Sequence, residues 1–146
     1  MVSFAEGYHR AIHGDCPPLS EDEHNSTVGL TRGAVSADLW TVYRAPLEYA
    51  NSRSQRKRLG DLIDRAFEVV PDWQLGPKLF RDEVIDTRNW LIHWGEKGRN
   101  TVEGPVARAL LVHRLVVVMY ANLTLDLGFD AHAVAQVIAK GWRELP

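Results

Sequence analysis

The chain has 146 residues, 45% of them hydrophobic and five of them tryptophan, which suits one domain with a core of its own. The formal net charge of -2 excludes a protein whose whole surface attracts nucleic acid, so any such contact must be local. The single cysteine, Cys16, cannot form a disulfide within the chain, and no basic and then apolar leader is present. We therefore expect a reducing, cytoplasmic setting.

The first expected helix covers residues 1–14, where Phe4, Tyr8 and Ile12 recur at four-residue steps and Gly14 can end it. Residues 15–35 contain two prolines, an acidic run and no clear period, so they are predicted to form a long loop. Ser36 is expected to cap the next helix, which Pro46 should kink or end.

Further helical segments are expected in the second part of the chain. Residues 54–70 carry apolar side chains at helical spacing, and Pro71 should end that helix. Pro77 suits the first position of the next helix and Gly95 suits its end. Pro105 should open a long helix that runs to about residue 128, and Asp130 should cap the last one. Because no strand pattern competes, the prediction is an all-α fold: a single domain over residues 1–146, a largely antiparallel bundle of four or five helices.

Residues 115–129 form the most apolar stretch of the chain. The stretch is shorter than the roughly 20 apolar residues that a bilayer requires, and polar side chains interrupt or flank it. We predict a buried core helix and no membrane span.

The helix expected at residues 79–94 carries a narrow band of polar side chains, called here the polar stripe, which consists of Asp82, Asp86, Asn89 and His93. Apolar side chains occupy most of the remaining circumference, so the helix should be buried everywhere except along this stripe. The stripe is interpreted either as a solvent-facing edge or as a functional site. A metal site would be unconvincing, because the set mixes Asp and Asn with a single His.

Arg88 does not belong to the polar stripe, since five residues separate it from His93 and an ideal helix turns them about 140° apart. The same Arg-x4-His spacing recurs at Arg108 and His113. Context distinguishes the two pairs, because only the first has a polar residue, Asn89, directly after the arginine and a glycine just beyond the histidine.

The segment RNWLIH, residues 88–93, resembles the RNxxxH motif of HEPN domains. The order and spacing of the other predicted helices are similar to the Apea-like branch of that family over most of the chain. Trp94 and Gly95 follow the histidine, without the tyrosine at the second position after it that marks a HEPN subgroup regulated by modification. Only residues 86–95 carry a specific resemblance.

The resemblance implies a helical-bundle ribonuclease that works without a metal or cofactor and forms its active site between two protomers. Arg88 would hold the phosphoryl oxygens, His93 would transfer protons, and Asn89 would orient the phosphate or the imidazole. The products would be a 2′,3′-cyclic phosphate and a 5′-hydroxyl. Apart from the resemblance, Asp86 lies on the same stripe as His93 and could hold its imidazole in one tautomer. Asp82 and Asp86 would, however, also repel an RNA backbone.

One basic cluster is present, at Arg53, Arg56, Lys57 and Arg58. It is interpreted either as a solvated first helical turn or as an RNA-backbone contact.

Two functions are therefore considered: an endoribonuclease of the toxin or phage-defence type, and a catalytically silent HEPN-like module for dimerisation or ligand binding. The expected partners are RNA, a second copy of the chain, and a regulatory or sensor domain or an antitoxin. We expect the two helices of residues 77–94 to lie near the dimer axis.

Overall fold

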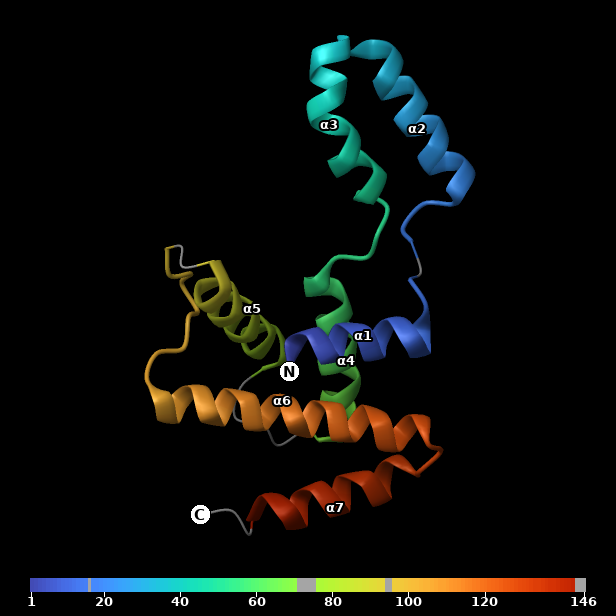
Figure 1. Cartoon of the computed structure of the whole chain (residues 1–146). Helices are drawn as coiled ribbons and strands as arrows, with labels where there is room; N and C mark the ends of the chain where they lie inside the picture. The colour runs from blue at the N-terminus through green and yellow to red at the C-terminus, as the bar shows by residue number, and fades with distance from the viewer. Residues whose placement is uncertain (16, 71–75, 94–95, 144–146) are drawn as a thin grey trace. The chain divides into compact units, whose positions relative to one another are not determined.

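A computed structural model describes residues 1–15, 17–70, 76–93 and 96–143. Within these ranges every regular element is helical, which confirms the predicted all-α fold (Figure 1). The described residues form seven helices rather than four or five: α1 (Val2–His13), α2 (Glu21–Ala34), α3 (Ala37–Tyr49), α4 (Gln55–Val69), α5 (Pro77–His93), α6 (Pro105–Asp126) and α7 (Ala131–Arg143).

Local signals set several helix boundaries as predicted. Pro77 and Pro105 are the first residues of α5 and α6, where a missing N–H costs no helical hydrogen bond. Asp130 caps α7, since its carboxylate accepts hydrogen bonds from the backbone N–H groups of residues 132 and 133 at 2.9 and 3.2 Å. Gly14, which follows α1, has a φ of 68°, a conformation that favours glycine.

The long loop predicted for residues 15–35 is wrong over most of its length, because α2 occupies Glu21–Ala34. Ser20 and Glu23 form a reciprocal capping box, and the acidic residues of the first turn suit the positive end of the helix dipole. The Ser20 hydroxyl and backbone N–H both donate hydrogen bonds to the Glu23 carboxylate, and these two bonds lower the pKa of Glu23. No residue of α2 is buried. A helix that buries no side chain needs no apolar period, which is why the pattern resembled a loop.

Residues 12–54 form a compact unit of their own that contains α2 and α3. Ser36 caps α3 as predicted, accepting a hydrogen bond from the Leu39 N–H, and the helix continues past Pro46. Leu19 and Asn51 are joined by two hydrogen bonds of 2.9 Å, which tie the start of the unit to its end.

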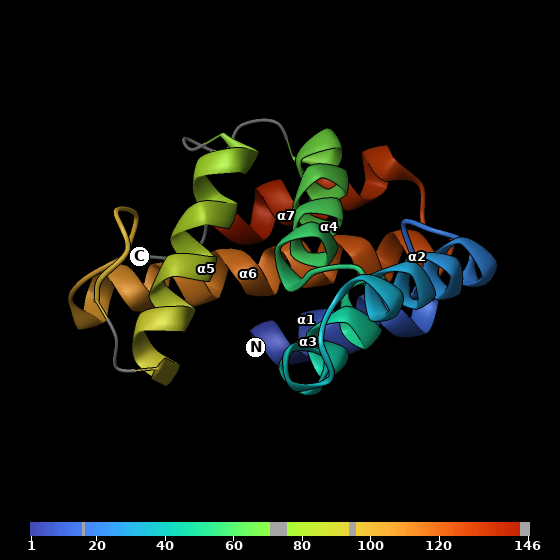
Figure 2. The same cartoon turned by 90° about the horizontal axis from the view of Figure 1, so that it is seen from above.

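The other unit comprises residues 1–11 and 55–146 and contains the main hydrophobic core. Helix α4 packs against α5, α6 and α7. In both views α4 crosses α6, and α7 returns alongside α6 after a short turn (Figures 1 and 2). The core side chains come from α1 and from α4 to α7; the most deeply buried are Ala5, Leu59, Leu62, Ile63, Ala66, Phe80, Leu115, Val118 and Ala121.

Polar contacts hold the helices around this core. The buried His9 of α1 lies 3.3 Å from the carboxylate of Asp61 on α4. Tyr8 donates a hydrogen bond to Asp126, which also pairs with Arg65 at 2.7 Å. Burial and the contact with Asp126 raise the pKa of the Tyr8 hydroxyl, so it stays protonated as the donor.

Helix α6 is, among the described residues, the one helix that is long and apolar enough to cross a membrane by length and composition alone. A core helix of a soluble protein has the same properties. One side of α6 packs against α4, where the fully buried Asn122 donates a hydrogen bond of 2.8 Å to the carbonyl of Leu62.

Glu83 of α5 provides a test of the electrostatics of this unit. Burial raises the pKa of its carboxyl group, and the nearby Arg114 opposes the shift. A raised pKa means that folding disfavours the ionised form, so the ionised carboxylate lowers the free energy of unfolding. This loss is fully present above the folded-state pKa and absent below the unfolded value of about 4.3. Glu83→Gln should therefore raise the free energy of unfolding at pH 7, and this gain should disappear as the pH falls below 4. Urea titrations at the two pH values measure it.

Glu68→Gln, at an exposed position of α4, is the matched control and should show no such pH-dependent gain. A Glu83→Gln variant less stable than the parent at pH 7 would contradict the prediction.

Candidate functional site

The residues of the RNxxxH segment lie in the last turns of α5, and His93 is its final residue. Asn89 and His93 are exposed, whereas Arg88 is half-buried. The guanidinium Nη1 of Arg88 donates a 3.2 Å hydrogen bond to Oδ1 of Asn89. Among the described residues no carboxylate pairs with Arg88, and its Nε is buried without an acceptor. Arg88 thus retains N–H donors for an anionic ligand.

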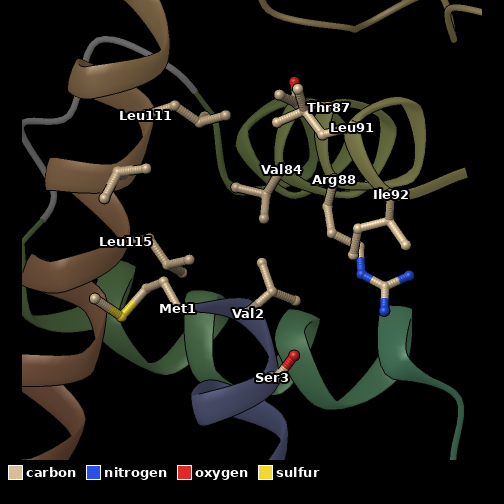
Figure 3. Close-up of a pocket in the computed structure, with 11 residues that line it drawn as sticks. Met1, Val2, Ser3, Val84, Thr87, Arg88, Leu91, Ile92, Leu111 and Leu115 are labelled. Atoms are coloured by element: carbon tan, nitrogen blue, oxygen red, sulfur yellow. The ribbon is translucent and has the colours of Figure 1, made fainter. Parts of the chain in front are cut away.

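Within one chain Arg88 and His93 face different ways. Five residues on a helix correspond to about 140° of rotation and about 7.5 Å of rise. Arg88 lines a pocket that is bounded by the start of α1, by α5 and by α6, and His93 is not among the residues of its wall (Figure 3). Sequence patterns could not reveal this pocket. The start of α1, which forms one wall, is about 80 residues from the wall on α5 and about 110 residues from the wall on α6.

The two acidic residues of the polar stripe are engaged inside the protein. Asp82 pairs with Arg56, and Asp86 accepts hydrogen bonds from the backbone N–H and the side-chain amide of Asn100 at 3.1 and 2.9 Å. Both carboxylate side chains are less than a fifth exposed, at 17% and 18%. The interpretation of the whole stripe as a solvent-facing edge is therefore wrong for this half of it. The orienting role at His93 stays a prediction, and the observed partners of Asp86 are Asn100 and, at 4.0 Å, the guanidinium of Arg56.

The connector between α5 and α6, residues 96–104, is attached to α5 along its length. Besides the contact between Asp86 and Asn100, the Val102 N–H donates a 2.8 Å hydrogen bond to the buried Thr87 hydroxyl. Gly98 lies so close to Asp86 that a Cβ added to it would be 2.7 Å from the carboxylate carbon. These contacts place the connector against the same helix that carries the RNxxxH segment.

The second Arg-x4-His pair has structural neighbours. The guanidinium of Arg108 lies over the Trp90 ring at 5.6 Å and donates a 3.2 Å hydrogen bond to the Gly104 carbonyl. Lys97 also contacts that ring, at 5.1 Å. His113 is half-buried and lines a different pocket, between α6 and α7. Arg108 therefore packs on the Trp90 ring of α5, whereas Arg88 lines the pocket described above.

The predicted basic cluster is not one free patch. Arg56 pairs with Asp82, Lys57 lies 3.0 Å from the carboxylate of Asp61, and Arg58 is buried at 4% exposure. Arg53 belongs to the unit of residues 12–54. An RNA-backbone contact by these four residues stays a prediction, and the three on α4 are already paired or buried.

Apolar side chains lie exposed beside the motif. Leu91 and Ile92 are 44% and 52% exposed, so the prediction that α5 is buried everywhere outside the polar stripe is wrong there. Trp90 is half-buried, and Trp94 and Gly95 fall outside the described residues. Leu91 and Ile92, which lie between Arg88 and His93 in the sequence, therefore provide an exposed apolar surface on α5.

Metal ligands are not grouped in the described part of the chain, where no cluster of three or more His, Cys, Asp or Glu side chains is found. Comparison with curated proteins and with solved structures gave no match. The family of Apea-like HEPN domains matches residues 1–133, nearly the whole chain. The helical architecture described above agrees with that match, and the motif that first indicated the family lies within the matched range. The chain belongs to the Apea-like HEPN family.

Proposed function

We propose that this domain is a metal-independent endoribonuclease that cleaves RNA through attack of the 2′-hydroxyl on the adjacent phosphate. The observation that carries the proposal is the state of Arg88: it has no carboxylate partner among the described residues, contacts Asn89, and lies on the same helix as the exposed His93. RNA contains its own nucleophile, so the protein needs only to position it, move protons and stabilise charge.

The three side chains divide these tasks. The planar guanidinium of Arg88 binds two phosphoryl oxygens and stabilises the negative charge that develops on the phosphorane. The imidazole of His93 acts as the general base or acid: it removes the 2′-OH proton or protonates the departing 5′-oxygen. Asn89 accepts a hydrogen bond from Arg88 at 3.2 Å and thereby restrains the guanidinium. Cleavage leaves a 2′,3′-cyclic phosphate and a 5′-hydroxyl.

The active site proposed here forms between two protomers. Because Arg88 and His93 of one chain lie on different sides of α5, the proposed site combines Arg88 of one protomer with His93 of the partner subunit across a two-fold axis near this helix. Leu91 and Ile92 supply an exposed apolar surface at the required place. Burial of this surface against the partner's α5 would provide the association free energy.

The dimer is tested with Ile92→Asp. An aspartate at the centre of the apolar surface should raise the dimer dissociation constant by at least about tenfold, because its charge would be desolvated in the interface. Light scattering coupled to size-exclusion chromatography at micromolar concentration measures the change. Val106→Asp is the matched control, since Val106 is 73% exposed at the start of α6. A wild-type protein that is monomeric at these concentrations would contradict the prediction.

The activity itself is tested by incubating purified protein with total RNA in the presence of EDTA. We expect cleavage, with cyclic-phosphate ends on the products. Absence of cleavage at high enzyme concentration would favour the alternative, a silent module for dimerisation or ligand binding. We place the ribonuclease in a cytoplasmic toxin or phage-defence setting, where a sensor domain or an antitoxin restrains it.

A further inference from the structure

The pocket beside Arg88 has the composition of a binding site for a chain-like apolar ligand. Its volume is about 270 Å³. Aliphatic side chains form most of its wall, among them Val2 of α1, Val84 and Leu91 of α5, and Leu111 and Leu115 of α6. Figure 3 shows these side chains converging on one space from the three helices.

The polar groups of the wall are few and of one charge. Among the described residues that line it, Arg88 has the one charged side chain, and no Asp or Glu is present. The buried Nε of Arg88 lacks an acceptor among the described residues. Ser3 and Thr87 are the neutral polar side chains of the wall, and the Thr87 hydroxyl already accepts the Val102 N–H at 2.8 Å. The electrostatics therefore favour a ligand with one anionic head.

The shape of the wall favours an alkyl chain over a nucleobase. No aromatic ring is among the described residues that line the pocket, and few of their side chains are available for the hydrogen-bonding edges of a base. Proteins that bind bases commonly use aromatic stacking and specific hydrogen bonds. An apolar cavity of 150 Å³ holds benzene, and by that ratio the space here suits roughly ten carbon atoms.

We propose that this pocket binds a medium-chain alkyl carboxylate, with its chain among the aliphatic side chains and its carboxylate on the guanidinium of Arg88. Binding would occupy the donors that the proposed ribonuclease uses for phosphate. The consequence for activity, which rests on the function proposed above, is that the ligand competes with RNA. The binding site stands independently of that activity.

Decanoate, titrated below its micelle-forming range, is the probe, and the shifts of valine and leucine methyl NMR signals are the readout. We expect saturable binding that weakens by about fourfold for each methylene removed, the factor that corresponds to the transfer of one CH₂ from water. Arg88→Gln should weaken decanoate at least tenfold and leave 1-decanol unaffected. Val112→Trp, which fills the pocket from its exposed rim, should abolish binding of both probes.

Two substitutions are matched controls. Val106→Trp adds the same side chain to α6 at an exposed position outside the pocket, and Arg108→Gln removes an arginine that stacks on Trp90; both should retain decanoate binding. Equal binding by the parent and Val112→Trp, no saturation by decanoate, or tighter binding of adenosine monophosphate than of decanoate would overturn the proposal.

An RNA-cleavage assay with decanoate completes the test. Competitive inhibition in the parent supports a carboxylate on Arg88, whereas inhibition that RNA cannot relieve would contradict the shared use of that residue. If no RNA is cleaved under any condition, the proposed function fails while the NMR titration still decides the binding site.

Discussion

Replacement of His93 or Arg88 by alanine should abolish most RNA cleavage while leaving the fold intact. Loss of a general acid or base costs about 10² to 10⁴ in rate, and loss of a donor to the transition-state charge costs about 10² to 10³. The exposed His93 contributes little to packing, and Arg88 has no ion-pair partner among the described residues, so each change should cost less than about 1 kcal/mol of stability. Asn89→Ala should reduce cleavage less. Single-turnover rates and thermal melts of the same preparations measure both quantities.

The second Arg-x4-His pair provides the internal control. Arg108 packs on Trp90, and His113 lies half-buried beside α7. Alanine at either position should lower the melting temperature clearly and change the rate of RNA cleavage little. The double variant Arg88→Ala, His93→Ala should be little slower than the worse single variant, because residues that act on one transition state lose their effect together. Full activity in His93→Ala, with a specific loss in a well-folded His113→Ala, would assign the chemistry to the other pair.

Gly98→Ala should destabilise the protein by about 1 to 3 kcal/mol. A Cβ at this position would lie 2.7 Å from the carboxylate carbon of Asp86, closer than real Cβ contacts, so Asp86 or the backbone at Gly98 must shift. That shift should weaken the two hydrogen bonds that Asp86 accepts from Asn100. Weaker hydrogen-bond donation to this half-buried carboxylate adds to the cost, although the guanidinium of Arg56 remains 4.0 Å away. The free energy of unfolding in urea measures the change. Gly76→Ala should have little effect, because a Cβ added there meets no atom of the described residues within 4 Å apart from its chain neighbours.

A double-mutant cycle separates the close contact from other effects of the alanine. In an Asp86→Ala background the obstructing side chain is absent, so Gly98→Ala should cost much less than in the parent. An equal cost in both backgrounds would show that the contact with Asp86 does not explain the requirement for glycine. A large cost of Gly76→Ala would likewise assign the effect to glycine substitution in general.

Much of the helical architecture could be predicted because its signals are local. Pro77, Pro105, Ser36 and Asp130 mark helix starts through the geometry of one turn, and the RNxxxH segment lies within a single helix. The capping box of Ser20 and Glu23 was equally local. The sequence nevertheless predicts a loop for residues 15–35, because they have no apolar period. A helix without buried residues, such as α2, has no need of such a period.

The amino-acid sequence is enough to predict the helical class, most helix starts, the family motif and two equivalent Arg-x4-His spacings. Only the tertiary structure distinguished the environments of the two arginines, since the neighbours of Arg88 and Arg108 come from other segments. It also decided that Asp82 pairs with Arg56, 26 residues earlier, and that Asp86 bonds Asn100, 14 residues later. The physical reason is that helical periodicity encodes which face a side chain shares, whereas its partner across a packed interface depends on how separate helices meet.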